Sequence, residues 1–427
     1  MKKLAAFALS LCIISGTSPA FRASFYDAAI TASAEENDYA LYEDNYLEYR
    51  VYSDHAELCG YSILSDDGNI IVPDEVIGVP VTRIASYAFA GGGPVNTMTI
   101  SDNVTSISND AFSGLEFLTS VRLPQGLTSI PDHAFEGCIS LTDIEIPDSV
   151  TKIGVEAFRR CESLKNIKIP SGVETISYGA FSCCSALESI RLPESVLWID
   201  HNAFDSCTSL VSINIPEAVT VIYRETFREC KSLVSVKLPS GIRQISELAF
   251  YGCSSLTHMT IPESVTSIGQ SAFAYCSALE EINIRNAECA IFDDASTISG
   301  RYSRTGTSTG DSSGYSYFYD GIIRGYEDST AQEYAEKYGY TFVPIYTGEF
   351  VSGDANLDGE LSVADATFIM QTLANPDECS FAGTNEWEKY LLCADVTGDG
   401  DGVTSADALS IQKYLAGIAP LSSGGQE

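Results

Sequence analysis

Two short segments near the C-terminus have the residue types and the spacing of calcium-binding loops. In the first, oxygen-bearing side chains recur at alternate positions around Gly359, and Glu360 offers its backbone carbonyl. The set is Asp354, Asn356, Asp358, Glu360, Ser362 and Asp365. A hard cation such as Ca²⁺ takes about six to eight oxygen ligands, and a loop with ligands at these offsets wraps around it. We therefore predict Ca²⁺ as the cofactor of this segment.

A second loop begins 41 residues after the first. Its oxygen-bearing residues are Asp395, Thr397, Asp399, Asp401, Thr404 and Asp407. It holds one residue more than the first loop between Gly400 and Val403, so Asp401 or Gly402 must bulge. Thr397 is also a weaker ligand than Asp or Asn. Each loop leads into a short amphipathic segment, and we expect a helix over 366–374 after the first.

The rest of the chain shows no catalytic constellation. None of the four histidines, His55, His133, His201 and His258, has a metal-ligand spacing, and His133 and His201 are expected near solvated turns. The stretch from Gly306 to Gly310 matches a nucleophile elbow, which needs a strand before it and a helix after it. It lies instead within residues 299–316, whose 6 Ser, 4 Gly and 3 Thr indicate a flexible surface loop. We expect no enzyme.

Charge and the N-terminus limit the partners. The formal net charge is −34, which disfavours nucleic acid as a partner, and residues 351–427 hold 13 Asp and Glu against 2 Lys and Arg. Lys2 and Lys3 precede an apolar run from Leu4 to Ile14 that is too short to span a bilayer. This pattern is typical of a signal peptide, assigned here to residues 1–34, with cleavage after Ala34 or, alternatively, Ala20. We expect a secreted protein with no membrane span.

A 23-residue repeat fills the middle of the chain without slippage. The recurring residues are Phe from 89 to 273, Ile from 84 to 268, Leu from 118 to 279 and Pro from 124 to 262. The Leu-x-x-Ile-x-Ile-Pro segment alternates as a half-buried strand does, and Pro ends the strand where its missing N–H costs least. One unit cannot bury its apolar face alone, so the units must stack as a solenoid.

Seven cysteines follow the same period, and they form a column in the predicted stack: Cys138, Cys161, Cys184, Cys207, Cys230, Cys253 and Cys276. They are interpreted as buried small apolar residues. The alternatives are a metal ladder or disulfides between neighbouring units, although a line of single thiols does not converge tetrahedrally as zinc requires.

The outward position between the two strand isoleucines gives a stripe of side chains. From the first unit to the last the stripe is Thr99, Arg122, Glu145, Lys168, Arg191, Asn214, Lys237, Thr260 and Asn283. Four of these nine are basic in a chain where acids outnumber bases 58 to 24. We hypothesise that Arg122, Lys168, Arg191 and Lys237 bind an acidic polysaccharide or an acidic protein surface. The alternative is ordinary solvating charge.

The repeat resembles the BspA-type bacterial leucine-rich repeat family. The resemblance implies a right-handed leucine-rich repeat solenoid, mainly β, over residues 81–290. Residues 35–80 resemble the family's starting unit. Residues 291–347 would hold the Ser/Gly-rich loop and the closing cap, which matches around Tyr334 and Phe342.

The paired calcium loops resemble the dockerin family. This resemblance implies a small all-α calcium-binding domain over 348–420, built from two EF-hand-like loop–helix motifs, which binds a cohesin module of a scaffoldin. The residues that match the family's contact positions are Val363, Ala364, Met370, Gln371, Asn375, Ser405, Ala406, Gln412 and Lys413.

Together the two resemblances imply a secreted, noncatalytic cellulosome subunit held at the cell surface through a scaffoldin. Its context would be polysaccharide breakdown. A dockerin-bearing hydrolase or peptidase, a protease inhibitor and an adhesin are the alternatives.

Overall fold

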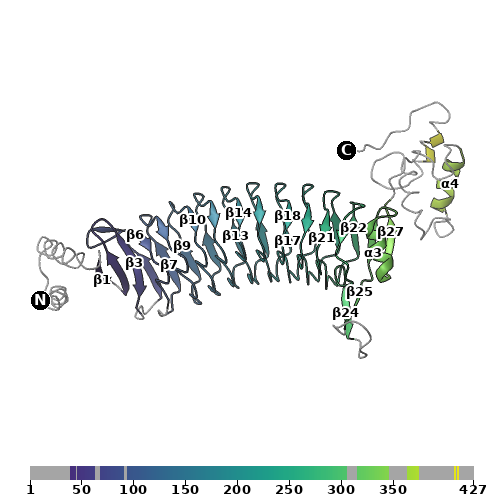
Figure 1. Ribbon diagram of the computed structural model, residues 1–427. Helices are drawn as coiled ribbons and strands as arrows, with labels where there is room; N and C mark the ends of the chain where they lie inside the picture. The colour runs from purple at the N-terminus through teal and green to yellow at the C-terminus, as the bar shows by residue number, and fades with distance from the viewer. Residues whose placement is uncertain are drawn as a thin grey trace, which may run out of the picture. The chain divides into compact units, whose positions relative to one another are not determined.

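The computed structural model describes residues 39–44, 46–62, 68–90, 94–304, 315–345, 363–374, 408–409 and 411–412. The predicted signal peptide and, apart from Asp365, all predicted calcium ligands lie outside these ranges. Contacts divide the chain into two units, residues 1–323 with 329–341 and residues 324–328 with 342–427. The first unit is the repeat solenoid in Figure 1.

The turns of the solenoid contribute strands to two parallel rows (Figure 1), and in the first row the turn of Lys237 contributes only an isolated bridge to Asn214. The first row is β4 (Asn69–Val72), β7 (Thr97–Ile100), β9 (Ser120–Arg122), β11 (Asp143–Glu145), β13 (Asn166–Lys168), β15 (Ser189–Arg191), β17 (Ser212–Ile213), β20 (His258–Ile261) and β22 (Glu281–Ile284). In-register pairing places Lys168 beside Arg191 and Arg122 beside Glu145. The predicted Leu-x-x-Ile-x-Ile strand is thereby confirmed.

The second row consists of short strands on the other wall of each turn. It runs through β6 (Val79–Ile84), β8 (Ser106–Ile107), β10 (Ser129–Ile130), β12 (Lys152–Ile153), β14 (Thr175–Ile176), β16 (Trp198–Ile199), β18 (Val221–Ile222), β19 (Gln244–Ile245), β21 (Ser267–Ile268) and β23 (Ala290–Ile291). The repeat isoleucines from Ile84 to Ile268 are all buried, which closes the core from the wall opposite the first row.

The repeat phenylalanines form a continuous stack inside the solenoid. All nine, from Phe89 to Phe273, are at most 2% exposed. Neighbouring ring centroids lie between 5.1 and 5.8 Å apart along the stack. Parallel strands repeat at nearly the same interval, so one ring per turn fills the interior without gaps.

A turn with left-handed backbone precedes each phenylalanine by two residues. His133 has φ 56° and Glu156 has φ 51°, and the equivalent residues of the other turns are also left-handed. This geometry lets alternate amides donate along the stack: the His133 N–H donates to the Val155 carbonyl at 2.8 Å and the Phe135 N–H to the Ala157 carbonyl at 2.8 Å. Side chains at this position therefore lie one above another on a lateral face.

The solenoid has distinct starting elements. An antiparallel group of β1 (Ala40–Asp44), β2 (Leu47–Val51) and β3 (Ala56–Tyr61) begins it, and β5 (Glu75–Val76) pairs with β6. After the repeats come β26 (Ile322–Gly325), helix α3 (Thr330–Tyr338) and β27 (Thr341–Pro344). Ser329 caps α3 at its N-terminus, and Gly339 ends it at φ 71°.

The prediction of a flexible surface loop over residues 299–316 is partly wrong. Its flanks form a hairpin of β24 (Arg301–Arg304) and β25 (Tyr315–Phe318), which projects from the stack in Figure 1. Tyr302 and Tyr317 are cross-strand partners in the hairpin, and their ring centroids lie 5.3 and 6.2 Å from that of Tyr275, so the hairpin packs on the repeat stack. Gly306–Gly310 lies outside the described residues.

In the second unit, helix α4 spans Val363–Ala374. It begins three residues before the predicted start at 366 and ends where expected. A second helical segment includes residues 408–409 and 411–412. Ala366 and Ile369 are fully buried in α4, and Ala408 and Ile411 are buried in the second segment.

Candidate functional site

The predicted stripe is an exposed row on the first strand row. The four basic residues and Thr99, Glu145, Asn214 and Thr260 are exposed, and only Asn283 is half-buried. The residues on either side of each stripe position point inward, as the strand period of two requires. The sequence therefore placed this surface correctly, and whether it binds a ligand stays a prediction.

Two of the four basic residues are already paired within the solenoid. Arg122 Nη2 lies 2.8 Å from Asp102 Oδ2, and Arg122 Nη1 donates to the Ile100 carbonyl at 3.0 Å. Lys168 Nζ lies 3.1 Å from Asp148 Oδ1. The pKa of Asp102 lies below its usual value because the Gln125 amide, and then Arg122, donate hydrogen bonds to its carboxylate.

Arg191 and Lys237 differ from these two. No carboxylate within the described ranges lies at ion-pair distance from either side chain. Arg122 and Lys168 each find their acid 20 residues earlier, in the preceding turn. Ser171 stands at that offset before Arg191, and Glu217 stands there before Lys237 without forming an ion pair. Arg191 and Lys237 are therefore the stripe's best-placed cations for an external anion.

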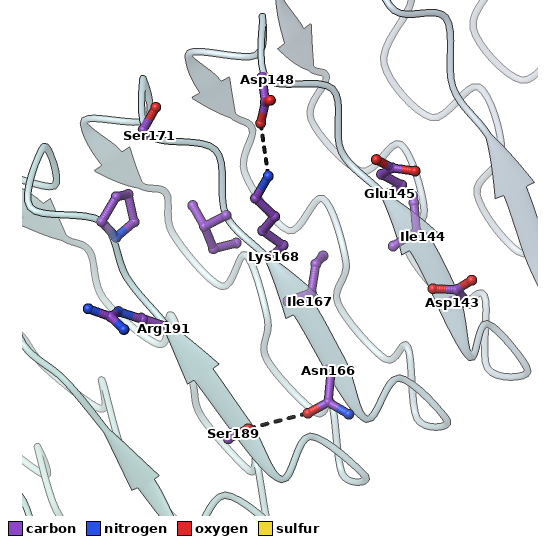
Figure 2. Close-up of a pocket in the computed structure, with 12 residues that line it drawn as sticks. Asp143, Ile144, Glu145, Asp148, Asn166, Ile167, Lys168, Ser171, Ser189 and Arg191 are labelled. Carbon is purple, nitrogen blue, oxygen red and sulfur yellow. Dashed lines mark hydrogen bonds and ion pairs between the residues drawn. The ribbon is translucent and has the colours of Figure 1, made fainter.

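An open groove of about 1010 Å³ crosses β11, β13 and β15 over the stripe (Figure 2). Asp143, Glu145 and Asp148 lie on one side of it, and Arg191 lies on the other. Between them the Ser189 hydroxyl donates to Asn166 Oδ1 at 3.3 Å. The lining offers hydroxyl, amide and charged groups to a ligand, and no nucleophile–base pair occurs among the lining residues.

Only part of the predicted partner-binding set falls in the described ranges. Val363 and Ala364 lie in the first turn of α4, Met370 is 48% exposed, and Gln371 and Gln412 are exposed. Asn375, Ser405, Ala406 and Lys413 lie outside the described residues, as do eleven of the twelve predicted calcium ligands. The twelfth, Asp365, lies in the first turn of α4.

Two exposed apolar residues beside the predicted contacts were missed by the sequence analysis. Leu373 is 43% exposed one turn after Met370, and Leu409 is 49% exposed in the second segment. Residues three apart share one face of a helix, so Met370 and Leu373 form an apolar strip on α4. The signal was present in the sequence, because Met370 and Leu373 continue the apolar face of Ala366 and Ile369 at helical spacing.

The cysteine column is buried and reduced among the described residues. All seven thiols are fully buried, and the ten described cysteines are free. Each Sγ donates to the phenylalanine carbonyl of the preceding turn, at 3.1 to 3.3 Å. Burial raises the pKa of the column, to about 12 for Cys138 and Cys276. Small apolar packing is therefore confirmed, with a hydrogen-bonding role that the sequence analysis did not foresee.

His133 is more engaged than a solvated turn residue. Its Nδ1 lies 2.8 Å from Glu136 Oε2 and 3.4 Å from Glu156 Oε2, and its side chain is 31% exposed. His201 has one acidic neighbour, with Nδ1 2.6 Å from Asp200 Oδ1, and its side chain is 44% exposed. The expectation of a solvated side chain thus describes His201 better than His133.

The stacked turns, the two strand rows and the phenylalanine ladder define a leucine-rich repeat solenoid. A family model for the BspA type leucine rich repeat region matches in 6 copies, over residues 82–211 and 198–296. These segments cover half of the chain. The chain belongs to the BspA-type leucine-rich repeat family.

Leucine-rich repeat proteins are among the solved structures that are similar to this chain. A leucine-rich repeat protein from Bacteroides ovatus is 26% identical with a TM-score of 0.55, over 66% of this chain and 70% of that one. The T. pallidum leucine-rich repeat protein is 27% identical with a TM-score of 0.38, over 51% of this chain and 91% of that one.

One curated relative has a short match. A xylanase/beta-glucanase from Ruminococcus flavefaciens is 47% identical over 66 residues, which is 15% of this chain and only 8% of that protein. Across the described residues, no helix is long and apolar enough to cross a membrane.

Proposed function

We propose that this protein is a secreted, noncatalytic binding subunit that a calcium-ordered dockerin module attaches to a cohesin of a scaffoldin. The observation that carries the proposal is the incompletely buried apolar face of α4. Ala366 and Ile369 are buried on this face, while Met370 and Leu373, three or four residues from them, are exposed. An exposed apolar strip beside a buried one indicates a surface that a partner covers.

The two loops supply the metal dependence in this proposal. Asp354, Asn356, Asp358, Ser362 and Asp365 would hold the first Ca²⁺ with the Glu360 carbonyl. Asp395, Thr397, Asp399, Asp401, Thr404 and Asp407 would hold a second, weaker one. Binding of a cation by acidic loops orders the helices that follow them, so calcium removal should abolish docking.

The short match to a xylanase/beta-glucanase supports a polysaccharide-degrading context. It covers 66 residues of a protein many times longer, so it supports a shared module better than a shared activity. The three carboxylates of the groove, Asp143, Glu145 and Asp148, lie on one side of it and do not face one another across it as glycosidase carboxylates do, which favours a noncatalytic role.

Calorimetric titration of the full chain against a panel of cohesins tests the docking. We expect binding in Ca²⁺ and none in EDTA. Met370→Glu should weaken binding at least about tenfold, since it places a charge in an apolar contact. Ile71→Glu, which alters a 71% exposed side chain of the solenoid, is the matched control. Calcium-independent binding, or no binding to any cohesin, would refute the proposal.

For the solenoid we propose an acidic polysaccharide as ligand of the stripe. Arg191 and Lys237 supply the attraction, while Asn166 and Ser189 offer hydrogen bonds to sugar hydroxyls. Because Arg122 and Lys168 are already neutralised, their contribution should be smaller.

Charge reversal tests this ranking on an array of acidic glycans. Arg191→Glu with Lys237→Glu should abolish retention, and Arg122→Glu with Lys168→Glu should reduce it less. Lys152→Glu with Arg243→Glu makes the same charge change at exposed residues on the other wall. Unchanged binding of all four stripe substitutions combined would sink the idea, and selective capture of an acidic protein would replace the glycan. Hydrolysis of xylan or β-glucan by the purified chain would overturn the noncatalytic assignment.

A further inference from the structure

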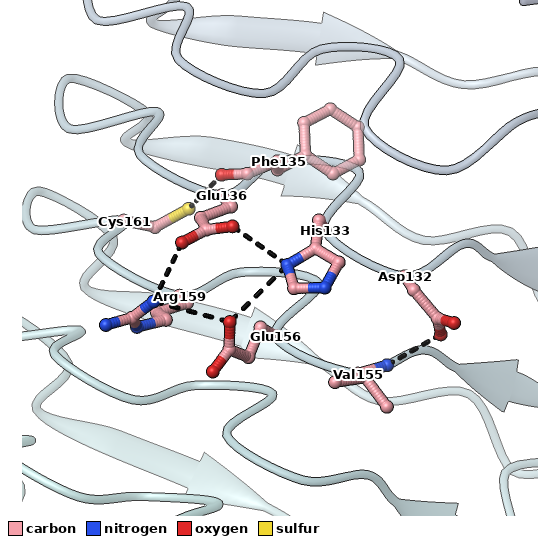
Figure 3. A network of polar contacts seen from close by, with 8 residues as sticks. All are labelled: Asp132, His133, Phe135, Glu136, Val155, Glu156, Arg159 and Cys161. Carbon is pink, nitrogen blue, oxygen red and sulfur yellow. Dashed lines mark hydrogen bonds and ion pairs between the residues drawn. The ribbon is translucent and has the colours of Figure 1, made fainter. Parts of the chain in front are cut away.

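A polar cluster of His133, Glu136, Glu156 and Arg159 lies on the lateral face of the solenoid (Figure 3). His133 and Glu156 occupy the left-handed position of successive turns, and Glu136 and Arg159 occupy the position directly after the phenylalanine in the same two turns. The stacking therefore brings two residues from each turn together. Figure 3 shows both carboxylates converging on one ring nitrogen of His133.

The distances suit a shared cation. His133 Nδ1 lies 2.8 Å from Glu136 Oε2 and 3.4 Å from Glu156 Oε2, and the three potential ligand atoms all lie within 4.8 Å of one another. Ligands at about 2.0–2.2 Å from a tetrahedral metal stand roughly 3.4 Å apart. Small side-chain adjustments would thus complete a coordination shell.

Arg159 leaves a place for this cation. Its Nη1 lies 2.9 Å from Glu136 Oε1, so the oxygen of Glu136 that faces His133 is not the one that Arg159 holds. Glu156 Oε2 faces both groups, 3.3 Å from Arg159 Nη1 and 3.4 Å from His133 Nδ1, so at this oxygen Arg159 and a metal would compete. Two carboxylates face one guanidinium. Arg159 is thus the one permanently charged positive group that these two carboxylates share within the cluster.

We propose that His133, Glu136 and Glu156 bind a divalent transition-metal ion, with Zn²⁺ as the natural candidate. One imidazole and two carboxylates are ligands that suit Zn²⁺, Mn²⁺ and Co²⁺. The three side chains are between 17% and 31% exposed, so water can fill the remaining position and the ion can exchange. Among the described residues this is the one such group of three.

Arg159 orients Glu136 and also competes with the metal. Its removal should therefore tighten metal binding, whereas a purely structural ion-pair cluster has no metal affinity to change. The site is independent of the proposed calcium loops.

Cobalt absorption titration of the full chain in saturating Ca²⁺, with Zn²⁺ competition, tests the site. Wild type should bind one Co²⁺ equivalent more than His133→Asn or Glu156→Gln. Asn is chosen because it tolerates left-handed backbone. His201→Gln, beside a single carboxylate, is the matched control and should match wild type. Arg159→Gln should tighten binding by roughly 5- to 10-fold, the effect of removing one partly exposed positive charge.

Equal cobalt stoichiometry and affinity in wild type, His133→Asn and Glu156→Gln would overturn the site. A thiolate-to-cobalt absorption band would overturn it too, since it would assign the ion to a cysteine such as Cys183. Thermal unfolding followed by circular dichroism verifies the fold of each variant. If one loses its fold, the other and the Arg159→Gln titration decide the outcome.

Discussion

Raising the pH above 9 should unfold the solenoid through its cysteine column. Burial raises the pKa of all seven thiols above the ordinary value of 9.0, so they stay protonated in the folded chain at pH 10. In the unfolded chain they ionise near that ordinary value. The unfolded state therefore binds fewer protons above pH 9, and the free energy of unfolding falls as pH rises.

The size of the effect follows from the number of thiols. At pH 10 each unfolded thiol contributes about 1.4 kcal/mol in favour of unfolding. Seven together give roughly 10 kcal/mol, which is comparable with the whole stability of an ordinary domain. The stabilisation is fully present below pH 9, and it is lost progressively as the pH rises from 9 toward the raised pKa values of the folded state.

Urea unfolding followed by circular dichroism between pH 7 and pH 10, in reductant, measures this loss. The triple variant Cys184→Ala, Cys207→Ala, Cys230→Ala should lose about 4 kcal/mol less over the same range, since three thiols no longer ionise. Buried tyrosines act in the same direction near pH 10, and the difference between the variants isolates the thiols. Identical pH dependence of the triple variant and wild type, or a stability flat to pH 10, would refute the reasoning.

Three further outcomes test the fold and the proposed docking module. Phe181→Ala should cost about 3–5 kcal/mol by urea unfolding because the ring is fully buried between Phe158 and Phe204, while the 58% exposed Phe117→Ala should change stability by less than about 0.5 kcal/mol. Gly154→Ala should lower the melting temperature because a Cβ would lie 2.5 Å from the Asp132 amide nitrogen; Gly126→Ala, with nothing within 4 Å, should leave it unchanged, and equal melting of the two would contradict the close approach. Asp354→Ala should abolish calcium-dependent cohesin binding in calorimetry, Asp395→Ala should weaken it less, and the reverse order would contradict the ranking of the loops.

The repeat period predicted the solenoid core because each turn must meet the same steric demand. A position that recurs every 23 residues as Phe or Ile faces the same neighbours in every turn, so its burial can be inferred without knowing the angle of the turn. The hydrogen bond from Cys138 to the Phe112 carbonyl was not predictable in this way. It depends on the direction of a carbonyl in the preceding turn, which the left-handed backbone sets.

The stripe shows the same limit for function. Alternation along the strand was enough to place Arg191 and Lys237 on the surface. It could not show that Arg122 and Lys168 are paired, because their acids lie in the turn of the preceding repeat. The available signal for such an ion pair was an acidic residue 20 positions before the basic one. This offset alone does not make an ion pair, because Glu217 lies 20 residues before Lys237 and does not pair with it.

Burial also reconciles a column of free thiols with the export that we propose. Oxidation and disulfide exchange proceed through the thiolate and need access to solvent. Cys207 is fully buried, its pKa is raised by desolvation, and its S–H is directed to the Phe181 carbonyl. Forming a disulfide with a neighbouring turn would require both thiols to leave such carbonyls inside a packed core. The fold itself therefore protects the reduced state, and an oxidising surrounding is compatible with the column.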